Sequence, residues 1–191
     1  MKSEFKDYIG IFRNLDNSDY CKSMIQEFEK LSNKDSSIVS DGELQFGNAM
    51  GRKDQSIFFD STSPDLAEQT NRILDQCLDK YMDEYPGLRN QNFMSQYVKV
   101  QKTLPKGGYH IWHSEQGSSN MHDASRCLVW TLYLNNISKG QGETEFLHQG
   151  YRLEPEEGMV CLFPASWTHV HRGNFTTTDT KYIATGWYNL I

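Results

Sequence analysis

The sequence predicts a mainly β protein that carries helices in its N-terminal part, an α+β fold. Two observations support this prediction. The first 95 residues contain two segments whose apolar residues recur at helical spacing, whereas the rest of the chain divides into short segments rich in β-branched and aromatic side chains. All six histidines lie in the second of these regions. We therefore expect the chemistry of the protein in its C-terminal half.

The two helical segments cover residues 18–31 and 63–85. Ser18 is a candidate N-cap of the first helix, and Pro64 is well placed in the first turn of the second, which Pro86 and Gly87 end. Each helix presents one apolar face, so we expect both to pack against a sheet. These faces contain Tyr20, Met24, Phe28 and Leu31 in the first helix and Leu66, Ile73, Cys77 and Tyr81 in the second.

The strand signals are concentrated after residue 93. Between the two helices, residues 42–60 combine Gly-rich stretches with an apolar run, which predicts a strand or two and a loop. Farther on, seven short segments are bounded by Gly, Pro, Asn or Ser, a pattern typical of a β-sandwich or barrel. These segments are residues 93–104, 108–115, 127–135, 144–149, 151–155, 158–164 and 181–189.

Length and composition limit the domain organisation and the partners. The 191 residues suit a single domain, in which residues 1–93 form a helical support region and residues 94–191 a β-rich core. The net charge is −6 and no basic stripe occurs, so nucleic acid is not indicated as a partner, although it stays open as a substrate. No segment resembles a signal peptide or a membrane span. We expect a soluble, cytoplasmic protein without a membrane partner, whose four distant cysteines are free, mostly buried thiols.

Three residues in the β-rich region form a candidate metal site. If residues 108–115 are a strand, alternation places His113 and Glu115 on the same face. A further histidine about 60 residues later, His169 or His171, would complete a set of two imidazoles and one carboxylate. Such a set binds non-haem Fe(II) and leaves coordination positions open. The H-x-E pattern alone is weak evidence, because it occurs by chance in many chains.

The order of several motifs adds specificity. The stretches GGYHIWHSE, YLN, GQGETEF, LFP, HRG and KYIATGWY follow one another between residues 107 and 188. In this order they resemble the prolyl 4-hydroxylase-like branch of the 2-oxoglutarate- and Fe(II)-dependent oxygenases, which includes small phage and marine bacterial members. The resemblance covers about residues 94–191. It implies a double-stranded β-helix, a cupin-like jelly-roll of two facing sheets, with the N-terminal helices packed against one side.

The resemblance also implies roles for individual residues. His113 and Glu115 match the first two catalytic metal ligands of the family, and His171 matches the third because Arg172 and Gly173 follow it. His169 would then lie at the pocket wall or just behind the ligands. The usual family ligand is Asp rather than Glu115, a change that lengthens the side chain and keeps the charge.

The same resemblance implies a binding site for 2-oxoglutarate. Lys181 matches the basic residue that pairs with the distal carboxylate of this cosubstrate, and Tyr133 matches a phenol that touches it. Thr185 shares a strand face with Lys181, so its hydroxyl can meet the same carboxylate. Many relatives carry a tyrosine where this chain has Thr103, which leaves one cosubstrate contact unassigned.

The implied reaction is hydroxylation of an unactivated C–H bond with Fe(II), 2-oxoglutarate and O₂, releasing succinate and CO₂; ascorbate is a further candidate cofactor. The favoured substrate is a prolyl residue in a peptide or protein, and the alternative is a small molecule or nucleobase. A cupin-like metal enzyme and a non-catalytic binding barrel are rival functions. Two polar loops, residues 46–56 and residues 116–125 with His122 and Asp123, are candidates for a mobile lid.

Overall fold

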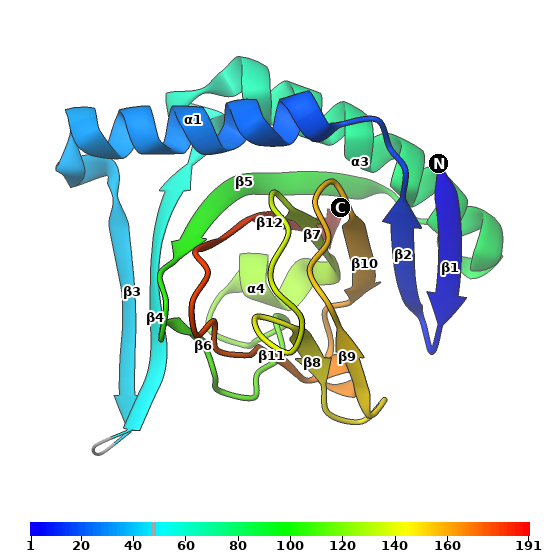
Figure 1. Ribbon diagram of the computed structural model, residues 1–191. Coiled ribbons are helices and arrows are strands. Elements are labelled where there is room, and N and C mark those ends of the chain that lie inside the picture. The colour runs from blue at the N-terminus through cyan, green and yellow to red at the C-terminus, as the bar shows by residue number, and fades with distance from the viewer. Residues whose placement is uncertain (47–48) are drawn as a thin grey trace.

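The computed structural model describes residues 1–46 and 49–191 and consists of two antiparallel sheets, with the two longest helices on the outside of the larger one (Figure 1). The larger sheet has the strand order β1-β2-β10-β7-β12-β5-β4-β3, and β6 pairs with β4. The smaller sheet has the order β11-β8-β9 and lies on the side of the larger sheet that faces away from the helices. The predicted combination of N-terminal helices and a β-rich core is confirmed.

The elements have the following bounds. The helices are α1 (Ser18–Lys34), α2 (Phe59–Thr62), α3 (Pro64–Glu84) and α4 (Met121–Ser125), with short 3₁₀ helices at Ser36–Ile38, Pro86–Leu88 and Trp167–His169. The first strands are β1 (Lys2–Lys6), β2 (Ile9–Arg13), β3 (Ser40–Phe46), β4 (Ala49–Phe58), β5 (Phe93–Thr103) and β6 (Gly108–Tyr109). The remaining strands are β7 (Arg126–Tyr133), β8 (Thr144–Phe146), β9 (Tyr151–Leu153), β10 (Val160–Pro164), β11 (His171–Gly173) and β12 (Lys181–Leu190).

Strand β7 shows how the larger sheet is buried on both faces. Leu128, Trp130 and Leu132 belong to the apolar cluster that also contains the inner faces of α1 and α3. Val129 and Tyr133 alternate with them and belong to a second cluster, which includes residues of the smaller sheet. Because side chains of successive strand residues point to opposite faces, one strand packs against the helices and lines the space between the sheets.

The two predicted long helices are confirmed. Helix α1 buries Cys21, Met24 and Phe28, and α3 buries a comparable apolar face, so both cover the larger sheet as Figure 1 shows. The N-cap of α1 is Asn17 rather than the expected Ser18, which is the first helical residue. The first intrahelical hydrogen bond runs from the Cys21 amide to Asn17 O at 2.9 Å, and the Asn17 side-chain amide donates to Gly158 O at 3.1 Å, which joins the helix start to the loop before β10.

Two parts of the sheet architecture differ from the expectation. The β1–β2 hairpin was not predicted, because its turn consists of Asp7 and Tyr8 at φ 49° and 64° instead of the Asn-Gly or Asp-Gly pair that signals such turns. Residues 108–115 were expected to be one strand, but only Gly108–Tyr109 is strand. Beyond Tyr109 the backbone is irregular up to an isolated bridge at His113.

The remaining predictions on composition concern the thiols and the membrane. All four cysteines are free, and Cys21, Cys77 and Cys161 are buried, as expected. Burial raises the pKa of the Cys77 thiol to about 12, so it is unreactive at neutral pH. Among the helices of residues 1–46 and 49–191, none has the length and apolarity that crossing a bilayer requires.

A substitution at Gly186 tests the close packing at the centre of the larger sheet. A Cβ atom at this position would lie 2.1 Å from Tyr97 O and 2.6 Å from the Trp130 ring. We predict that Gly186→Ala lowers the free energy of unfolding by at least about 2 kcal/mol in urea denaturation, because a backbone carbonyl must move. Gly87→Ala is the control, since no atom lies within 4 Å of its added Cβ. Equal stability of the two variants would contradict this packing.

Candidate active site

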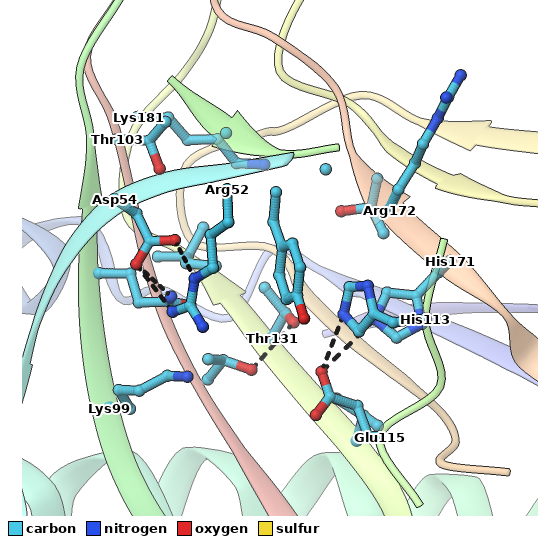
Figure 2. A pocket seen from close by; sticks show the side chains of 18 of the residues that line it. Arg52, Asp54, Lys99, Thr103, His113, Glu115, Thr131, His171, Arg172 and Lys181 are labelled. Carbon is cyan, nitrogen blue, oxygen red and sulfur yellow. Dashed lines mark hydrogen bonds and ion pairs between the residues drawn. The ribbon is translucent and has the colours of Figure 1, made fainter. Parts of the chain in front are cut away.

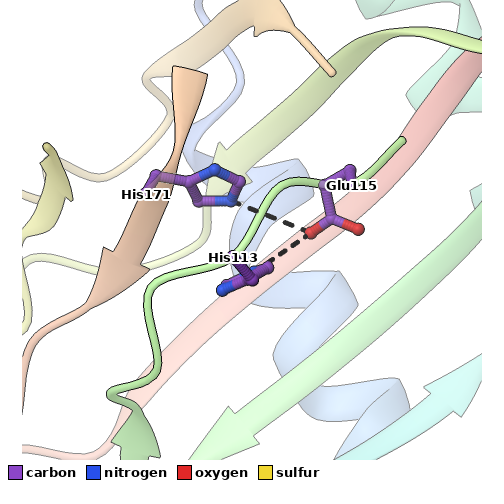
Figure 3. A group of neighbouring side chains, drawn as sticks. All are labelled: His113, Glu115 and His171. Atoms are coloured by element: carbon purple, nitrogen blue, oxygen red, sulfur yellow. Dashed lines mark ion pairs between the residues drawn. The ribbon is translucent and has the colours of Figure 1, made fainter. Parts of the chain in front are cut away.

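His113 and His171 come together through their backbones. The His113 amide donates to His171 O at 3.0 Å, and the His171 amide donates to His113 O at 2.9 Å. This isolated antiparallel bridge joins the irregular segment after β6 to β11, which β8 holds in the smaller sheet. Glu115 follows two residues later, where its amide donates to Ala165 O at 3.1 Å. Figure 3 shows the three side chains converging on one point.

The ring orientations leave one nitrogen of each imidazole free for a metal. The Nδ1 atom of His113 lies 2.8 Å from Ile111 O, and that of His171 lies 3.0 Å from His169 O. A carbonyl oxygen only accepts, so each Nδ1 carries the proton and donates, and each Nε2 presents a lone pair. These Nε2 atoms lie 3.4 Å and 3.8 Å from Glu115 Oε1, and the three ligand atoms lie within 4.8 Å of one another.

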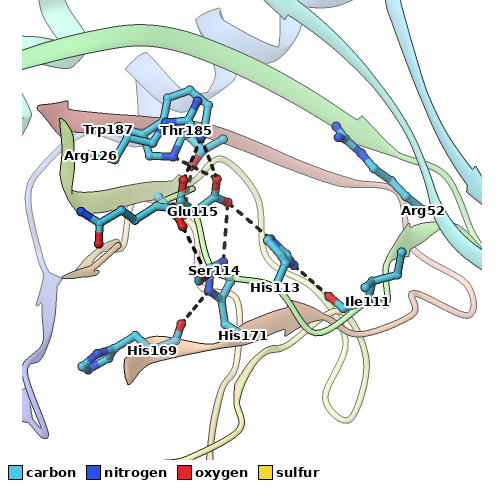
Figure 4. Close-up of polar contacts among 12 residues, drawn as sticks. Arg52, Ile111, His113, Ser114, Glu115, Arg126, His169, His171, Thr185 and Trp187 are labelled. Carbon is cyan, nitrogen blue, oxygen red and sulfur yellow. Dashed lines mark hydrogen bonds and ion pairs between the residues drawn. The ribbon is translucent and has the colours of Figure 1, made fainter. Parts of the chain in front are cut away.

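Glu115 is held by groups that do not compete for Oε1. Trp187 Nε1 donates to Glu115 Oε2 at 3.1 Å, and Arg126 Nη1 donates to Glu115 O at 2.9 Å. The Arg126 guanidinium also stacks over the Trp187 ring, with its carbon 3.8 Å from the ring centroid (Figure 4). The carboxylate is thereby oriented with Oε1 toward the two imidazoles.

Electrostatics keep His171 neutral and Glu115 charged, the forms that bind a divalent cation. Burial lowers the pKa of His171 to about 4, and the neighbouring His113 adds to this effect, so His171 is neutral at pH 7. Burial alone would raise the pKa of Glu115, but its contact with His113 and the charges of nearby groups outweigh this effect and hold the pKa well below its usual range. Two neutral imidazoles and one carboxylate are the donor set that fits Fe(II).

These residues line a cavity of about 300 Å³ between the two sheets. Lys181 projects into it from β12 and is 8 % exposed. Its Nζ donates to Gly142 O at 2.7 Å and lies 5.5 Å from the Tyr133 ring centroid. No carboxylate of the described residues lies within 4.0 Å of this ammonium. Burial lowers the pKa of Lys181 to about 8, and an anion bound beside it would favour the charged form.

The two other residues expected at the cosubstrate have different surroundings. Thr185 lines the cavity, but its hydroxyl donates to Trp130 O at 2.8 Å. Tyr133 does not line the cavity; it is buried, and its hydroxyl shares a 2.7 Å hydrogen bond with Thr144, which does line it. Thr103 lies opposite Lys181 in the β5–β12 register and also lines the cavity (Figure 2).

Several charged cavity residues were missed in the sequence. Arg52 on β4 pairs with Asp54 through two contacts of 2.6 Å and 2.9 Å, and Lys99 projects from β5 (Figure 2). Tyr109 stacks on His113 with ring centroids 3.9 Å apart. A signal was available for Lys99: in residues 98–101, Lys99 and Gln101 alternate with the buried Val98 and Val100, which indicates a polar interior face.

His169 lies directly behind His171, whose Nδ1 donates to the His169 carbonyl at 3.0 Å, but its side chain does not reach the pocket wall. It belongs to the 3₁₀ helix Trp167–His169, so the two-residue period that would place it beside His171 does not apply. Its Nε2 atom lies 2.8 Å from Asp7 O, and its Nδ1 atom lies 3.0 Å from the Thr168 hydroxyl. The side chain therefore anchors the β1–β2 turn, outside the cavity.

Part of each candidate lid is a regular element, whereas residues 116–120 of the second candidate are irregular. Residues 49–56 of the first candidate belong to β4, which pairs with β3, β5 and β6, while residues 47–48 lie outside the described residues. In the second candidate, Met121–Ser125 form α4, and Asp123 binds Arg126 at 3.0 Å. Paired strands and a capped helix are more constrained than the polar loops predicted from composition.

Comparison with known proteins agrees with this geometry. Residues 96–189 match the family model described as the 2OG-Fe(II) oxygenase superfamily. The chain belongs to this superfamily. No curated protein matches the sequence significantly. The predicted family is thus confirmed, and the chain is a dioxygenase that uses Fe(II), 2-oxoglutarate and O₂.

Solved structures of other superfamily proteins show the same fold. A viral collagen prolyl hydroxylase from Paramecium bursaria Chlorella virus 1 is 15 % identical over 97 % of each chain, with a TM-score of 0.73. A Pseudomonas putida prolyl-4-hydroxylase is 16 % identical over 95 % of this chain and 92 % of that one, with a TM-score of 0.70. A Trichoplax adhaerens prolyl hydroxylase in complex with a hypoxia-inducible factor peptide is 19 % identical over 96 % and 84 %, with a TM-score of 0.71. The predicted jelly-roll fold is confirmed.

The metal content of two variants distinguishes the neighbouring histidines. We predict that His171→Ala loses stoichiometric Fe(II), because one imidazole of the ligand set is removed. His169→Ala is expected to retain Fe(II), since its ring contacts Asp7 and Thr168 instead. Anaerobic titration with Fe(II), followed by metal analysis of the desalted protein, measures both. Iron loss in His169→Ala together with retention in His171→Ala would show that the ligand is misassigned.

Proposed function

We propose that this chain is a 2-oxoglutarate-dependent hydroxylase that acts on proline, in the first instance a prolyl residue of a peptide or protein. The observation that carries the proposal is one cavity with two features: a His-Glu-His set and a buried lysine without a carboxylate partner among the described residues. The prolyl substrate is supported by the three structural neighbours, whose names describe prolyl hydroxylases. The small-molecule alternative is supported by a separate observation on Lys99, developed below.

In this proposal His113, Glu115 and His171 hold Fe(II). When bound, iron and 2-oxoglutarate supply the oxidising chemistry that converts O₂, cosubstrate and a C–H bond into succinate, CO₂ and an alcohol. The protein contributes orientation: the two carbonyls that accept from Nδ1 fix the imidazoles, and Trp187 fixes the carboxylate. The position of these groups between two sheets limits access of water to the reaction.

Lys181 binds the distal carboxylate of 2-oxoglutarate. The cosubstrate anion would remove the cost of burying an ammonium whose only hydrogen bond among the described residues is to a backbone carbonyl. Thr103 lies opposite Lys181 in the register and is a candidate donor at the position where relatives have tyrosine. Tyr133 acts through Thr144 and by packing beneath Lys181, while Thr185 contributes polar lining.

The domain organisation belongs to the same proposal. We propose that residues 1–191 work as one domain, in which residues 1–93 support the catalytic core of residues 94–191. The β1–β4 strands and the core strands share one sheet, which supports this arrangement. Residues 1–93 also supply Arg52 and Asp54 to the cavity lining, so they contribute to the site itself.

The oxygenase activity is tested by succinate formation. We predict that purified protein forms succinate from 2-oxoglutarate only with Fe(II) and O₂, and that Glu115→Ala abolishes the reaction without unfolding the protein. Glu115→Asp is expected to keep part of the activity, because the charge remains while the reach is shorter. The control is Glu154→Ala, which removes an exposed carboxylate remote from the cavity lining. Full activity of folded Glu115→Ala would contradict the ligand assignment.

The pH dependence of kcat/KM for 2-oxoglutarate tests the role of Lys181. Because the free-enzyme pKa is about 8, we predict that kcat/KM for 2-oxoglutarate falls as the pH rises above 8, approaching about tenfold per unit. Lys181→Arg should move this fall to higher pH, since a guanidinium stays charged. Lys181→Met should remove the pH dependence and weaken cosubstrate binding roughly tenfold or more while retaining Fe(II). An unchanged cosubstrate constant in Lys181→Met would exclude this residue from the site.

A further inference from the structure

One cation in the cavity has no partner after the proposed metal and cosubstrate are taken into account. Lys99 lines the cavity from β5, and its Nζ lies 5.3 Å from the centroid of the Trp187 ring. Within residues 1–46 and 49–191, this ammonium makes no hydrogen bond and has no carboxylate within 4.0 Å. Gly47 and Asn48, which lie outside the described residues, carry no charge.

The other charges of the cavity can be matched in pairs. Fe(II) and 2-oxoglutarate would carry opposite double charges, and the single charges of Glu115 and Lys181 are also opposite, so these four groups together have no net charge. Each of the three arginines that line the cavity contacts a carboxylate, although Arg172 shares Glu145 with Arg152, so Lys99 remains a cavity cation with no carboxylate of the described residues in contact. These pairs are Arg52 with Asp54 at 2.6 Å, Arg126 with Asp123 at 3.0 Å, and Arg172 with Glu145 at 2.7 Å.

Lys99 lies toward the metal ligands and away from Lys181. In the β5–β12 register, Lys99 is opposite Thr185, whereas Lys181 is opposite Thr103, four residues farther along β5. That separation corresponds to about 13 Å along the strand. Trp187 links Lys99 to the metal site, because its ring lies beneath Nζ and its Nε1 donates to Glu115. An anion at Lys99 would therefore lie near the reacting carbon, separate from the distal carboxylate of the cosubstrate.

The size of the cavity limits what can supply this anion. A volume of about 300 Å³ is at the lower end of the range for ligand sites, and the cosubstrate takes part of it. Little more than one substrate residue can enter. A proline has no ionisable side chain, and inside a peptide it carries no charge, so the only anion that it can bring is its own α-carboxylate.

We propose that Lys99 binds the α-carboxylate of the substrate, which is therefore free proline or a proline at the C-terminus of a peptide. This inference rests on the proposed prolyl hydroxylase function and narrows its substrate class. Burial lowers the pKa of the Lys99 ammonium, and a carboxylate beside it would restore the preference for the charged form. The guanidinium of Arg52, already paired with Asp54, would remain in place beside the bound substrate.

The test compares each carboxylate with its neutral carboxamide. Substrate-stimulated succinate formation is measured with L-proline and L-prolinamide, and with a short peptide that ends in proline as the acid or the amide. The same peptide with its proline in an internal position completes the panel. We predict that the wild-type protein prefers each acid over its amide at least about tenfold in kcat/KM, because a charge-assisted contact is lost in the amide. The free amino acid and the C-terminal peptide are distinguished by which acid gives the higher value.

Substitutions at Lys99 assign the preference to this residue. Lys99→Met is expected to reduce the acid-to-amide ratio to within about twofold while leaving the 2-oxoglutarate constant unchanged, and Lys99→Arg should keep most of the ratio. Lys102→Met is the matched control: it lies on the same strand, and its ammonium pairs with Glu29 on the helix side at 2.8 Å. Calorimetric titration of acid and amide, with Fe(II) and 2-oxoglutarate present but without O₂, gives the same comparison without turnover.

The possible outcomes distinguish binding of a substrate carboxylate at Lys99 from other roles of this residue. Equal stimulation by acids, amides and the internal prolyl peptide would overturn the proposal, as would the absence of any stimulation. A raised 2-oxoglutarate constant in Lys99→Met with an unchanged acid-to-amide ratio would assign Lys99 to the cosubstrate instead. Iron-dependent succinate formation without added substrate is measured alongside. If that basal reaction persists while the panel fails, the oxygenase assignment stands and only the substrate proposal falls.

Discussion

The site depends on the two-residue period of three neighbouring strands, β5, β7 and β12. On one face these strands carry apolar side chains that pack against α1 and α3, and on the other they carry the polar side chains of the cavity. Burial of the apolar face fixes the register, because a slip of one residue would exchange the two faces. The positions of Lys99, Thr103, Lys181 and Trp187 are thus set by packing that involves none of them.

This arrangement makes a polar cavity compatible with a stable fold. Burying a charged group costs free energy. In the cavity this cost is offset because most charged side chains pair with an opposite charge on the same or a neighbouring segment. Glu29 performs a similar task on the helix side, where it binds Lys102 at 2.8 Å and accepts from the Tyr182 hydroxyl at 2.6 Å. Among the cations that line the cavity, Lys99 and Lys181 have no carboxylate of the described residues within 4.0 Å, and a ligand in the cavity can reach both.

Much of the fold could be predicted from local periodicity, but pairing over long distances could not. Helices α1 and α3 and strands β5, β7, β10 and β12 have strong patterns of 3.6 or two residues, and the structure contains them. The side chain of His169 could not be placed from the sequence, because it ends the 3₁₀ helix Trp167–His169 and so does not share a face with His171. Arg52 was missed because only the pairing of β4 with β5 and β6 brings it to the cavity. The convergence of His113, Glu115 and His171 could be predicted because the motif order resembles a family, even though the segment that carries His113 and Glu115 is irregular backbone.

The two histidine rings are oriented by their own chain segments, since each Nδ1 donates to the carbonyl two residues earlier. Between His113 and His171 themselves, the connection consists of two backbone hydrogen bonds. A bound ion would therefore act as a cross-link between two segments 58 residues apart in sequence. Metal release is then coupled to local opening of this bridge. Amide exchange in the segment from Ile111 to Glu115 therefore reports on iron occupancy, while the helix-covered sheet stays closed.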